Sequence, residues 1–202
     1  MTDTPLICLA SASPRRRELL AQLGVPHRVA PAGIDESRRA GEPPADYVLR
    51  MALEKAIRVA AQPDLSGALP VLGADTTVLV EGRMLGKPAD AAESRAMLEL
   101  LAGRSHEVLS AVALVDAQGA RSRLSRTEVR FRRIDPGEAA AYWASGEPCD
   151  KAGGYAIQGR AAAFVESLSG SYSGVVGLPL FETAQLLEAA GIAPWRGERG
   201  PR

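Results

Sequence analysis

The sequence from Val71 to Val80 restricts the fold of this chain more than any other segment. It is mostly apolar and rich in β-branched residues, which is typical of a largely buried strand, and Glu81-Gly82 then marks a turn into a returning strand. One carboxylate, Asp75, stands in the middle of this run. Unpaired burial of a charge costs several kcal/mol. We therefore expect Asp75 to face a cleft, to pair with a basic group or to hold a metal.

Proline, glycine and capping residues divide the rest of the chain into short helices and strands. A strand is expected at 6–10, followed by a helix with Ser13 as its N-cap and Pro14 as its first residue, closed by Gly24. We further expect helices at 44–61, 90–103, 135–146 and 179–190, strands at 108–115, 124–131 and 162–166, and a loop at 169–178. Helices mixed with hairpins indicate an α/β or α+β fold around a mixed sheet.

Length and composition favour one folding unit over residues 1–202, with a frayed tail at 193–202. The 24 basic and 24 acidic residues balance, which argues against a polyanion or a membrane surface as partner. No apolar run reaches the roughly 18 residues that span a bilayer. Two cysteines and a start without a basic leader segment predict a cytoplasmic protein with reduced thiols.

Three consecutive arginines, Arg15-Arg16-Arg17, occupy the first turn of the expected helix after Pro14. Helix N-termini favour anions and disfavour cations, so the usual charge preference is inverted here. A strand that leads through small serines into a helix N-terminus can bind an anion, and arginines would add charge-assisted hydrogen bonds. A phosphate chain fits this arrangement. A solvated basic turn, with Ser13 as an ordinary cap, is the alternative.

Only three of the 24 basic residues are lysine, namely Lys55, Lys87 and Lys151, which makes each a candidate for a site that needs a compact ammonium group. Lys55 lies within the apolar stripe of its helix, where its ammonium group either turns outward or reaches a cleft beside Asp75. Lys87, just past the hairpin, is a natural candidate to lie near Asp75. A structural Asp–Lys ion pair at a sheet end is the alternative.

Two further segments are weaker candidates when taken alone. Asp35-Glu36 supplies a second acidic group, and two carboxylates among several cations suit a magnesium-bound triphosphate. The glycine-rich segment 150–159 combines a flexible backbone with Lys151, Tyr155 and Gln158, and could surround a base or a phosphate. An ordinary surface loop is the alternative for this segment.

Taken together, five blocks in order along the chain resemble the Maf family of nucleotide pyrophosphatases. The resemblance covers about 85 per cent of the chain, and its blocks are Leu9–Arg16, Gly73–Thr76, Gly86–Pro88, Asp150–Gly153 with Ile157–Gly159, and Val175–Pro179. It implies a two-lobed α/β fold with a mixed sheet, flanking helices and a central cleft, similar to the inosine triphosphate pyrophosphatases. It also implies a divalent metal cofactor (Mg or Mn) and a homodimer.

The resemblance also implies roles for single residues. Asp75 matches the proton acceptor, Arg15, Thr76 and Gln158 match positions tied to nucleotide choice, and Ser11, Arg16, Glu36, Lys55 and Lys87 match the phosphate and metal surroundings. We therefore expect Asp75, Lys55 and Lys87 to be catalytic, and Glu36 with Asp75 to bind the metal, with Asp75 acting either as the proton acceptor or only as a metal ligand. Substrate would be bound by Ser11, Arg15, Arg16, Thr76, Lys151 and Gln158.

The blocks favour the branch that hydrolyses dTTP and UTP to the monophosphate and pyrophosphate. Gly174, where relatives often carry Asn, and Thr77, where an apolar residue is common, depart from the pattern, and the first change could loosen base selectivity. Activity on 7-methyl-GTP or inosine triphosphate is an alternative. A non-catalytic regulator of septum formation is another, although neutral charge and few aromatic residues argue against a nucleic-acid surface.

Overall fold

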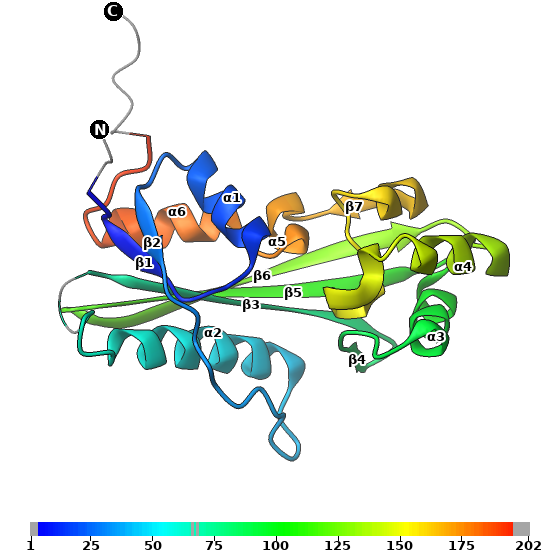
Figure 1. Cartoon of the computed structure of the whole chain (residues 1–202), viewed down its shortest axis with the longest axis horizontal. Coiled ribbons are helices and arrows are strands. Elements are labelled where there is room, and N and C mark those ends of the chain that lie inside the picture. The colour runs from blue at the N-terminus through cyan, green and yellow to red at the C-terminus, as the bar shows by residue number, and fades with distance from the viewer. Residues whose placement is uncertain (1–3, 66, 68, 196–202) are drawn as a thin grey trace, which may run out of the picture.

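The computed structural model describes residues 4–65, 67 and 69–195, and these form a mixed sheet flanked by helices (Figure 1). The expected mixed α/β architecture is therefore confirmed. Its elements are β1 (Ile7–Leu9), α1 (Pro14–Gln22), β2 (His27–Val29), α2 (Pro44–Ala60), β3 (Val71–Val80), β4 (Arg83–Leu85), α3 (Ala91–Leu101), β5 (Ser105–Asp116), β6 (Gly119–Phe131), α4 (Pro136–Ala144), three 3-10 turns (Glu147–Asp150, Ala152–Gly154 and Arg160–Phe164), β7 (Val165–Ser169), α5 (Tyr172–Val176) and α6 (Leu180–Ala189).

The sheet has the strand order β2-β1-β3-β5-β6-β7, and β4 pairs with β3 outside this path. β1 pairs in parallel with β2 and with β3, whereas the remaining pairs are antiparallel. The long strands β3, β5 and β6 run through the length of the molecule (Figure 1). Helix α2 covers one face of the sheet at one end, α1 and α6 cover the other face, and α3 and α4 lie at the far end.

Four apolar clusters pack against the sheet, and two of them lie at opposite ends of these long strands. At one end, Ile7, Leu72 and Leu187 belong to a core with α1 and α6. At the other end, Val78 and Phe131 belong to a core with α3, α4 and β7. Strand β3 contributes to both cores, and Asp75 lies on it between Leu72 and Val78. A polar side chain at this position therefore falls where the strand passes from one core to the other.

The predicted helix starts at Ser13, Asp90 and Asp135 are confirmed, since each caps its helix through a side-chain oxygen. Two predictions for the C-terminal part were wrong. The strand expected at 162–166 is β7 at 165–169, preceded by a 3-10 turn, and the loop expected at 169–178 contains α5, which Ser171 caps. Residues 196–202 of the predicted tail lie outside the described residues, whereas the Trp195 indole donates to the Gln22 carbonyl oxygen at 3.0 Å.

Candidate active site

The turn between β1 and α1 builds one wall of a cleft. Ser13 Oγ accepts from the backbone N–H of Arg16, as the predicted cap requires. The Arg16 guanidinium donates from Nε to the Gly177 carbonyl oxygen at 2.8 Å and from Nη1 to Ser11 Oγ at 3.4 Å. Burial lowers the pKa of Arg16 from its ordinary value, and the charge of Asp75 opposes that effect. The arginine is thus fixed near the helix N-terminus, where an anion would be held.

Lys55 reaches Asp75 because α2 lies very close to β3. A Cβ added at Gly73 would stand 2.1 Å from the Ala52 carbonyl oxygen, so only glycine permits this approach. Lys55 Nζ lies 2.7 Å from Asp75 Oδ1, and the two side chains are only 9% and 12% exposed. Of the two outcomes open for Lys55, the structure shows the inward one. The partner of Asp75 is therefore Lys55 on α2.

The same ammonium group contacts a second carboxylate. Lys55 Nζ lies 2.7 Å from Glu36 Oε1, and the Tyr47 hydroxyl donates to the Glu36 carbonyl oxygen at 2.9 Å, which holds this loop against α2. Burial raises the pKa of Asp75 although Lys55 and Arg16 oppose it. Burial acts in the same direction on Glu36, but the hydrogen bond and charge of Lys55 outweigh it, and the pKa of Glu36 is lowered. The two carboxylates therefore differ in basicity.

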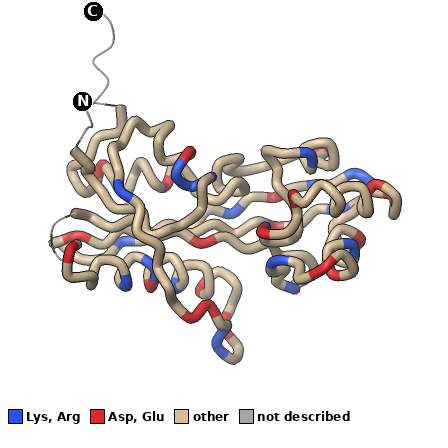
Figure 2. Tube along the Cα trace, viewed as in Figure 1, with Lys and Arg blue, Asp and Glu red and all other residues tan. Residues whose placement is uncertain are grey.

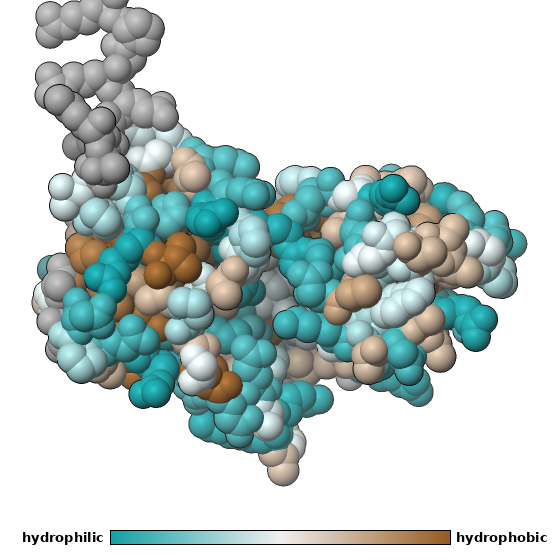
Figure 3. All heavy atoms as spheres, in the orientation of Figure 1, coloured by the Kyte–Doolittle hydropathy of each residue, from teal (hydrophilic) through white to brown (hydrophobic). Residues whose placement is uncertain are grey.

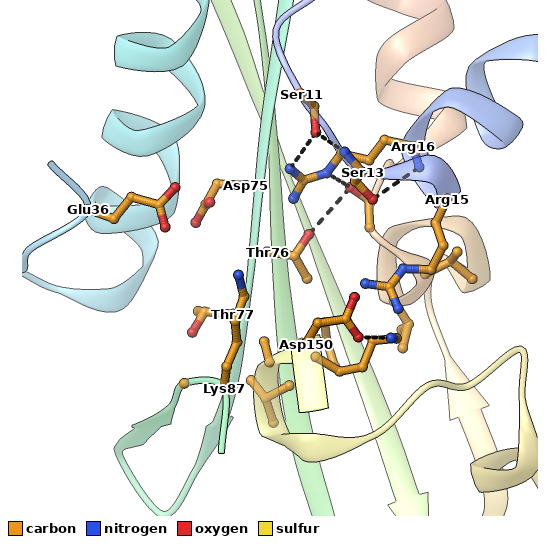
Figure 4. A pocket seen from close by; sticks show the side chains of 18 of the residues that line it. Ser11, Ser13, Arg15, Arg16, Glu36, Asp75, Thr76, Thr77, Lys87 and Asp150 are labelled. Carbon is orange, nitrogen blue, oxygen red and sulfur yellow. Dashed lines mark hydrogen bonds and ion pairs between the residues drawn. The ribbon is translucent and has the colours of Figure 1, made fainter. Parts of the chain in front are cut away.

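Lys87 and Arg15 complete the ring of charge around this pair. Figure 4 shows the Glu36 and Asp75 carboxylates pointing toward one another, with the Lys87 side chain extending toward them from below and Arg15 and Arg16 approaching from the opposite wall. The Lys87 loop is held by a backbone hydrogen bond of 2.9 Å from the Gly153 N–H to the Gly86 carbonyl oxygen. Cations therefore face the acidic pair from two directions.

The glycine-rich segment forms the remaining wall. Gly153 has a φ of +71°, and an added Cβ would stand 2.8 Å from Val78 Cγ2, so glycine is required by both conformation and space. Tyr155 is buried, with its hydroxyl 2.8 Å from His106 Nε2. Lys151 pairs with Asp150, and Gln158 is exposed at the edge of the cleft. This wall therefore has polar side chains at its rim and a buried tyrosine ring beneath them.

Together these walls enclose a cleft of about 770 Å³. Every residue to which the sequence assigned a catalytic, substrate-binding or metal-binding role lines it, namely Ser11, Arg15, Arg16, Glu36, Lys55, Asp75, Thr76, Lys87, Lys151 and Gln158, whereas the neighbouring Arg17 and Asp35 do not. Sequence reasoning missed Arg38 and Tyr47, which also line the cleft. The position of Tyr47 could have been found, because it lies eight residues before Lys55 on the same stripe of α2. Arg38 carries no such signal.

The acidic groups of the cleft fit a metal only in part. Within residues 4–65, 67 and 69–195, no group of three His, Cys, Asp or Glu side chains is placed to hold a metal ion. Glu36 and Asp75 offer two carboxylates, and both contact Lys55. Magnesium in phosphate-transfer sites is commonly held by one or two carboxylates together with substrate phosphates. This donor set therefore fits a metal shared with a phosphate ligand rather than a site made of protein alone.

The surface around the cleft carries both charge signs and is largely polar. Basic and acidic positions are interspersed over the whole trace (Figure 2). Away from an apolar region beside β1 and β2, the face in Figure 3 is mostly hydrophilic. None of the helices in the described part of the chain is long and apolar enough to cross a membrane. Fold and site thus define an α/β protein with one cationic cleft around a buried carboxylate–ammonium pair.

Known proteins with similar sequences place the chain in a family. The sequence profile of the Maf-like protein family matches residues 6–190, so the chain belongs to the Maf family. A dTTP/UTP pyrophosphatase of Nitrosomonas europaea is 52% identical over 197 residues, covering 93% of this chain and 95% of the relative. A dTTP/UTP pyrophosphatase of Aromatoleum aromaticum is 53% identical and covers 92% and 95% of the two chains.

A solved structure, that of the Staphylococcus aureus Ham1 protein, is more distantly similar. It shares 14% sequence identity with a TM-score of 0.41, and the match covers 62% of this chain and 71% of that one.

Proposed function

We propose that this protein hydrolyses dTTP and UTP to the corresponding monophosphate and pyrophosphate. The observation that carries the proposal is the buried Asp75–Lys55 pair, which faces Arg15 and Arg16 across one cleft. Near-full-length relatives more than 50% identical are dTTP/UTP pyrophosphatases, which supports the choice of substrate. Phosphoryl transfer depends mainly on positioning and on electrostatic stabilisation, which is what this cleft offers.

In the proposed mechanism, Asp75 accepts a proton from the water molecule that attacks the α-phosphorus. Its pKa is raised by burial, which makes the carboxylate a better proton acceptor than an exposed aspartate. The bond from the α-phosphorus to the bridging oxygen then breaks, and pyrophosphate leaves. Lys55, Lys87, Arg15 and Arg16 lie around this position and would neutralise charge on the phosphate oxygens.

The base would lie toward the glycine-rich wall. Thr76 and Gln158 line the cleft and carry groups that both donate and accept hydrogen bonds, as the edge of a pyrimidine requires. Thr76 Oγ1 lies 3.1 Å from Ser110 Oγ, which fixes its orientation. Lys151 and Ser11 line the same cleft and would contact the remaining polar parts of the substrate.

A divalent cation, Mg or Mn, is part of the proposal. Glu36 and Asp75 would hold it together with the phosphate oxygens, and when bound it would supply positive charge at the α-phosphate. The lowered pKa of Glu36 keeps this carboxylate ionised and able to act as a ligand at neutral pH. Pyrophosphate release measured with magnesium, with manganese and with a chelator tests this requirement.

We also propose a cytoplasmic homodimer that removes unwanted nucleotides. Both cysteines, Cys8 and Cys149, are free thiols, which is consistent with a reducing compartment. The molar mass in solution, measured by light scattering, tests the dimer independently of activity. A monomer of about 21 kDa would contradict this part alone.

The decisive experiment compares pyrophosphate release from dTTP, UTP, inosine triphosphate and 7-methyl-GTP by the wild type and Asp75→Asn. We expect release from dTTP and UTP, and a loss of about 10²–10⁴-fold in kcat on losing a proton acceptor. Asp64→Asn is the matched control, because Asp64 is an exposed carboxylate paired with Arg28. A preference for either purine would move the assignment to that alternative. No release from any triphosphate would favour the regulatory reading of the family.

A further inference from the structure

A carboxylate outside the cleft, Glu147, holds the turn that carries Gln158. Glu147 Oε2 accepts from the backbone N–H of Arg160 at 3.0 Å, and Oε1 accepts from that of Ala161 at 3.3 Å. The Tyr142 hydroxyl donates to Glu147 Oε1 at 2.7 Å. One side chain therefore receives three hydrogen bonds, two of them from the backbone just after Gln158.

Tyr142 extends the same support to the other side of the turn. It is 4% exposed, and while it donates to Glu147, its oxygen accepts from the backbone N–H of Ala156 at 3.1 Å. The segment from 156 to 161 is thus held at both ends, with Gln158 between them. Gly159 lies directly on the carboxylate, because an added Cβ would stand 2.3 Å from Glu147 Oε2.

The chemistry of this contact requires a carboxylate. Burial acts to raise the pKa of Glu147, but the N–H groups of Arg160 and Ala161 and the Tyr142 hydroxyl outweigh it, and the pKa is lowered. Glu147 is therefore ionised at neutral pH and is an acceptor at both oxygens, which matches three donors. A glutamine would keep the shape but would point an NH2 group at one or more of these donors.

We propose that Glu147, together with Tyr142, is a positioning residue that fixes Gln158 for recognition of the pyrimidine base. Glu147 does not line the cleft and so acts through the turn. This inference rests on the proposed function, since it assigns the turn to base recognition. It predicts that loss of the carboxylate weakens base recognition and leaves the chemistry at Asp75 intact.

The test compares the wild type with Glu147→Gln, using Glu166→Gln as matched control because Glu166 is half exposed and pairs with Arg130 at 2.9 Å. For Glu147→Gln we expect KM for dTTP and UTP to rise about tenfold, the magnitude of one or two lost hydrogen bonds, with kcat within about twofold of wild type. The preference for dTTP over inosine triphosphate should fall by a similar factor. Tyr142→Phe removes only a hydroxyl and should shift KM in the same direction by less.

Hydrogen exchange gives a readout that does not depend on turnover. The amides of Arg160 and Ala161 should exchange faster in Glu147→Gln than in the wild type. The amides of β3 and β5 should exchange at the same rate in both proteins. Unchanged KM and unchanged selectivity would overturn the inference while the proposed function stands. So would an equal fall of kcat for every triphosphate, which a general loss of structure would produce. If the wild type releases no pyrophosphate, the proposed function fails and the inference falls with it.

Discussion

Two of the walls of the cleft are built in different ways. The chemical wall, formed by Glu36, Lys55 and Asp75, depends on close packing of α2 on β3, with the acid–ammonium pair almost out of solvent. The base wall, residues 150–161, consists of short turns held by hydrogen bonds from side chains behind it. Rigid elements position reacting groups more accurately than turns do. Substitutions in the chemical wall should therefore change kcat, and those in the base wall should change KM and selectivity.

Among substitutions in the two walls, removal of Lys55 should cause the largest loss of stability and of kcat. Lys55→Met leaves Asp75 buried without its partner, which costs about 3–5 kcal/mol of unfolding free energy. Lys55 lowers the pKa of Asp75, so its loss raises that pKa further and favours the protonated, non-basic form of the carboxyl group. We expect kcat to fall about 10²-fold or more and the acidic limb of its pH profile to move to higher pH.

The control for this prediction is Arg28→Met, which removes a cation from an exposed pair with Asp64. Such surface pairs contribute about 0–1 kcal/mol, so stability and kcat should stay close to wild type. Kinetics and denaturant unfolding of both variants give the comparison. If Lys55→Met changed only KM, the division between the two walls would be wrong.

His106, on β5, contacts Tyr155 of the base wall and should make the unfolding free energy of the protein depend on pH. It is buried beneath Tyr155, and burial lowers its pKa to about 4. The unfolded chain binds a proton near pH 6.5 whereas the folded protein resists it until about pH 4. Stability should therefore fall by about 3 kcal/mol as the pH drops across this window, and level off below it.

His106→Phe removes the titrating group and keeps an aromatic ring in the cluster with Phe131 and Tyr155. The variant also loses the hydrogen bond to Tyr155, which changes its stability at every pH. The two proteins are therefore compared by the slope of unfolding free energy against pH and not by its absolute value. The measurement is unfolding free energy from pH 7 to pH 4 in both proteins. Parallel curves would show that another group is responsible.

Local features of the fold were predictable because their causes lie within a few residues. Ser13, Asp90 and Asp135 cap helices through contacts within three residues, and each was recognised from sequence. The limits of β7 were not, because its start depends on a distant pairing with β6 that includes a register shift at 130–131. The short edge strand β2 has no apolar alternation and left no pattern to find.

The site shows the same distinction. The sequence marked every residue of the chemical wall, named Lys87 as a natural candidate to lie near Asp75, and left open whether Lys55 turned inward. The ion pair with Lys55 depends on how closely α2 approaches at Gly73. Glu147 was missed because its contacts with 160 and 161 span more than ten residues.

Gly73→Ala tests whether that close approach is what holds the chemical wall together. The added methyl group would overlap backbone atoms of α2, which cannot move as a side chain can, so α2 must shift. Overpacking of this kind costs about 1–3 kcal/mol. Because Lys55 moves with α2, kcat should also fall, while dTTP preference over inosine triphosphate stays the same. Gly33→Ala is the matched control, since a Cβ there meets nothing within 4 Å.

Ser110 supports Thr76, the residue next to Asp75 on β3, and its substitution should have the smallest effect on kcat and stability. Ser110 Oγ donates to the Gly174 carbonyl oxygen at 2.6 Å and lies 3.1 Å from Thr76 Oγ1, one residue beyond Asp75. Ser110→Ala removes both contacts without changing the backbone, at a cost of about 1 kcal/mol of unfolding free energy. The control is Ser105→Ala, at the exposed end of β5. Because Thr76 belongs to the base contacts and Asp75 to the chemistry, KM should rise about fivefold with kcat nearly unchanged. A fall in kcat instead would mean that the position of Asp75 depends on its neighbour, and that the two walls act as one unit.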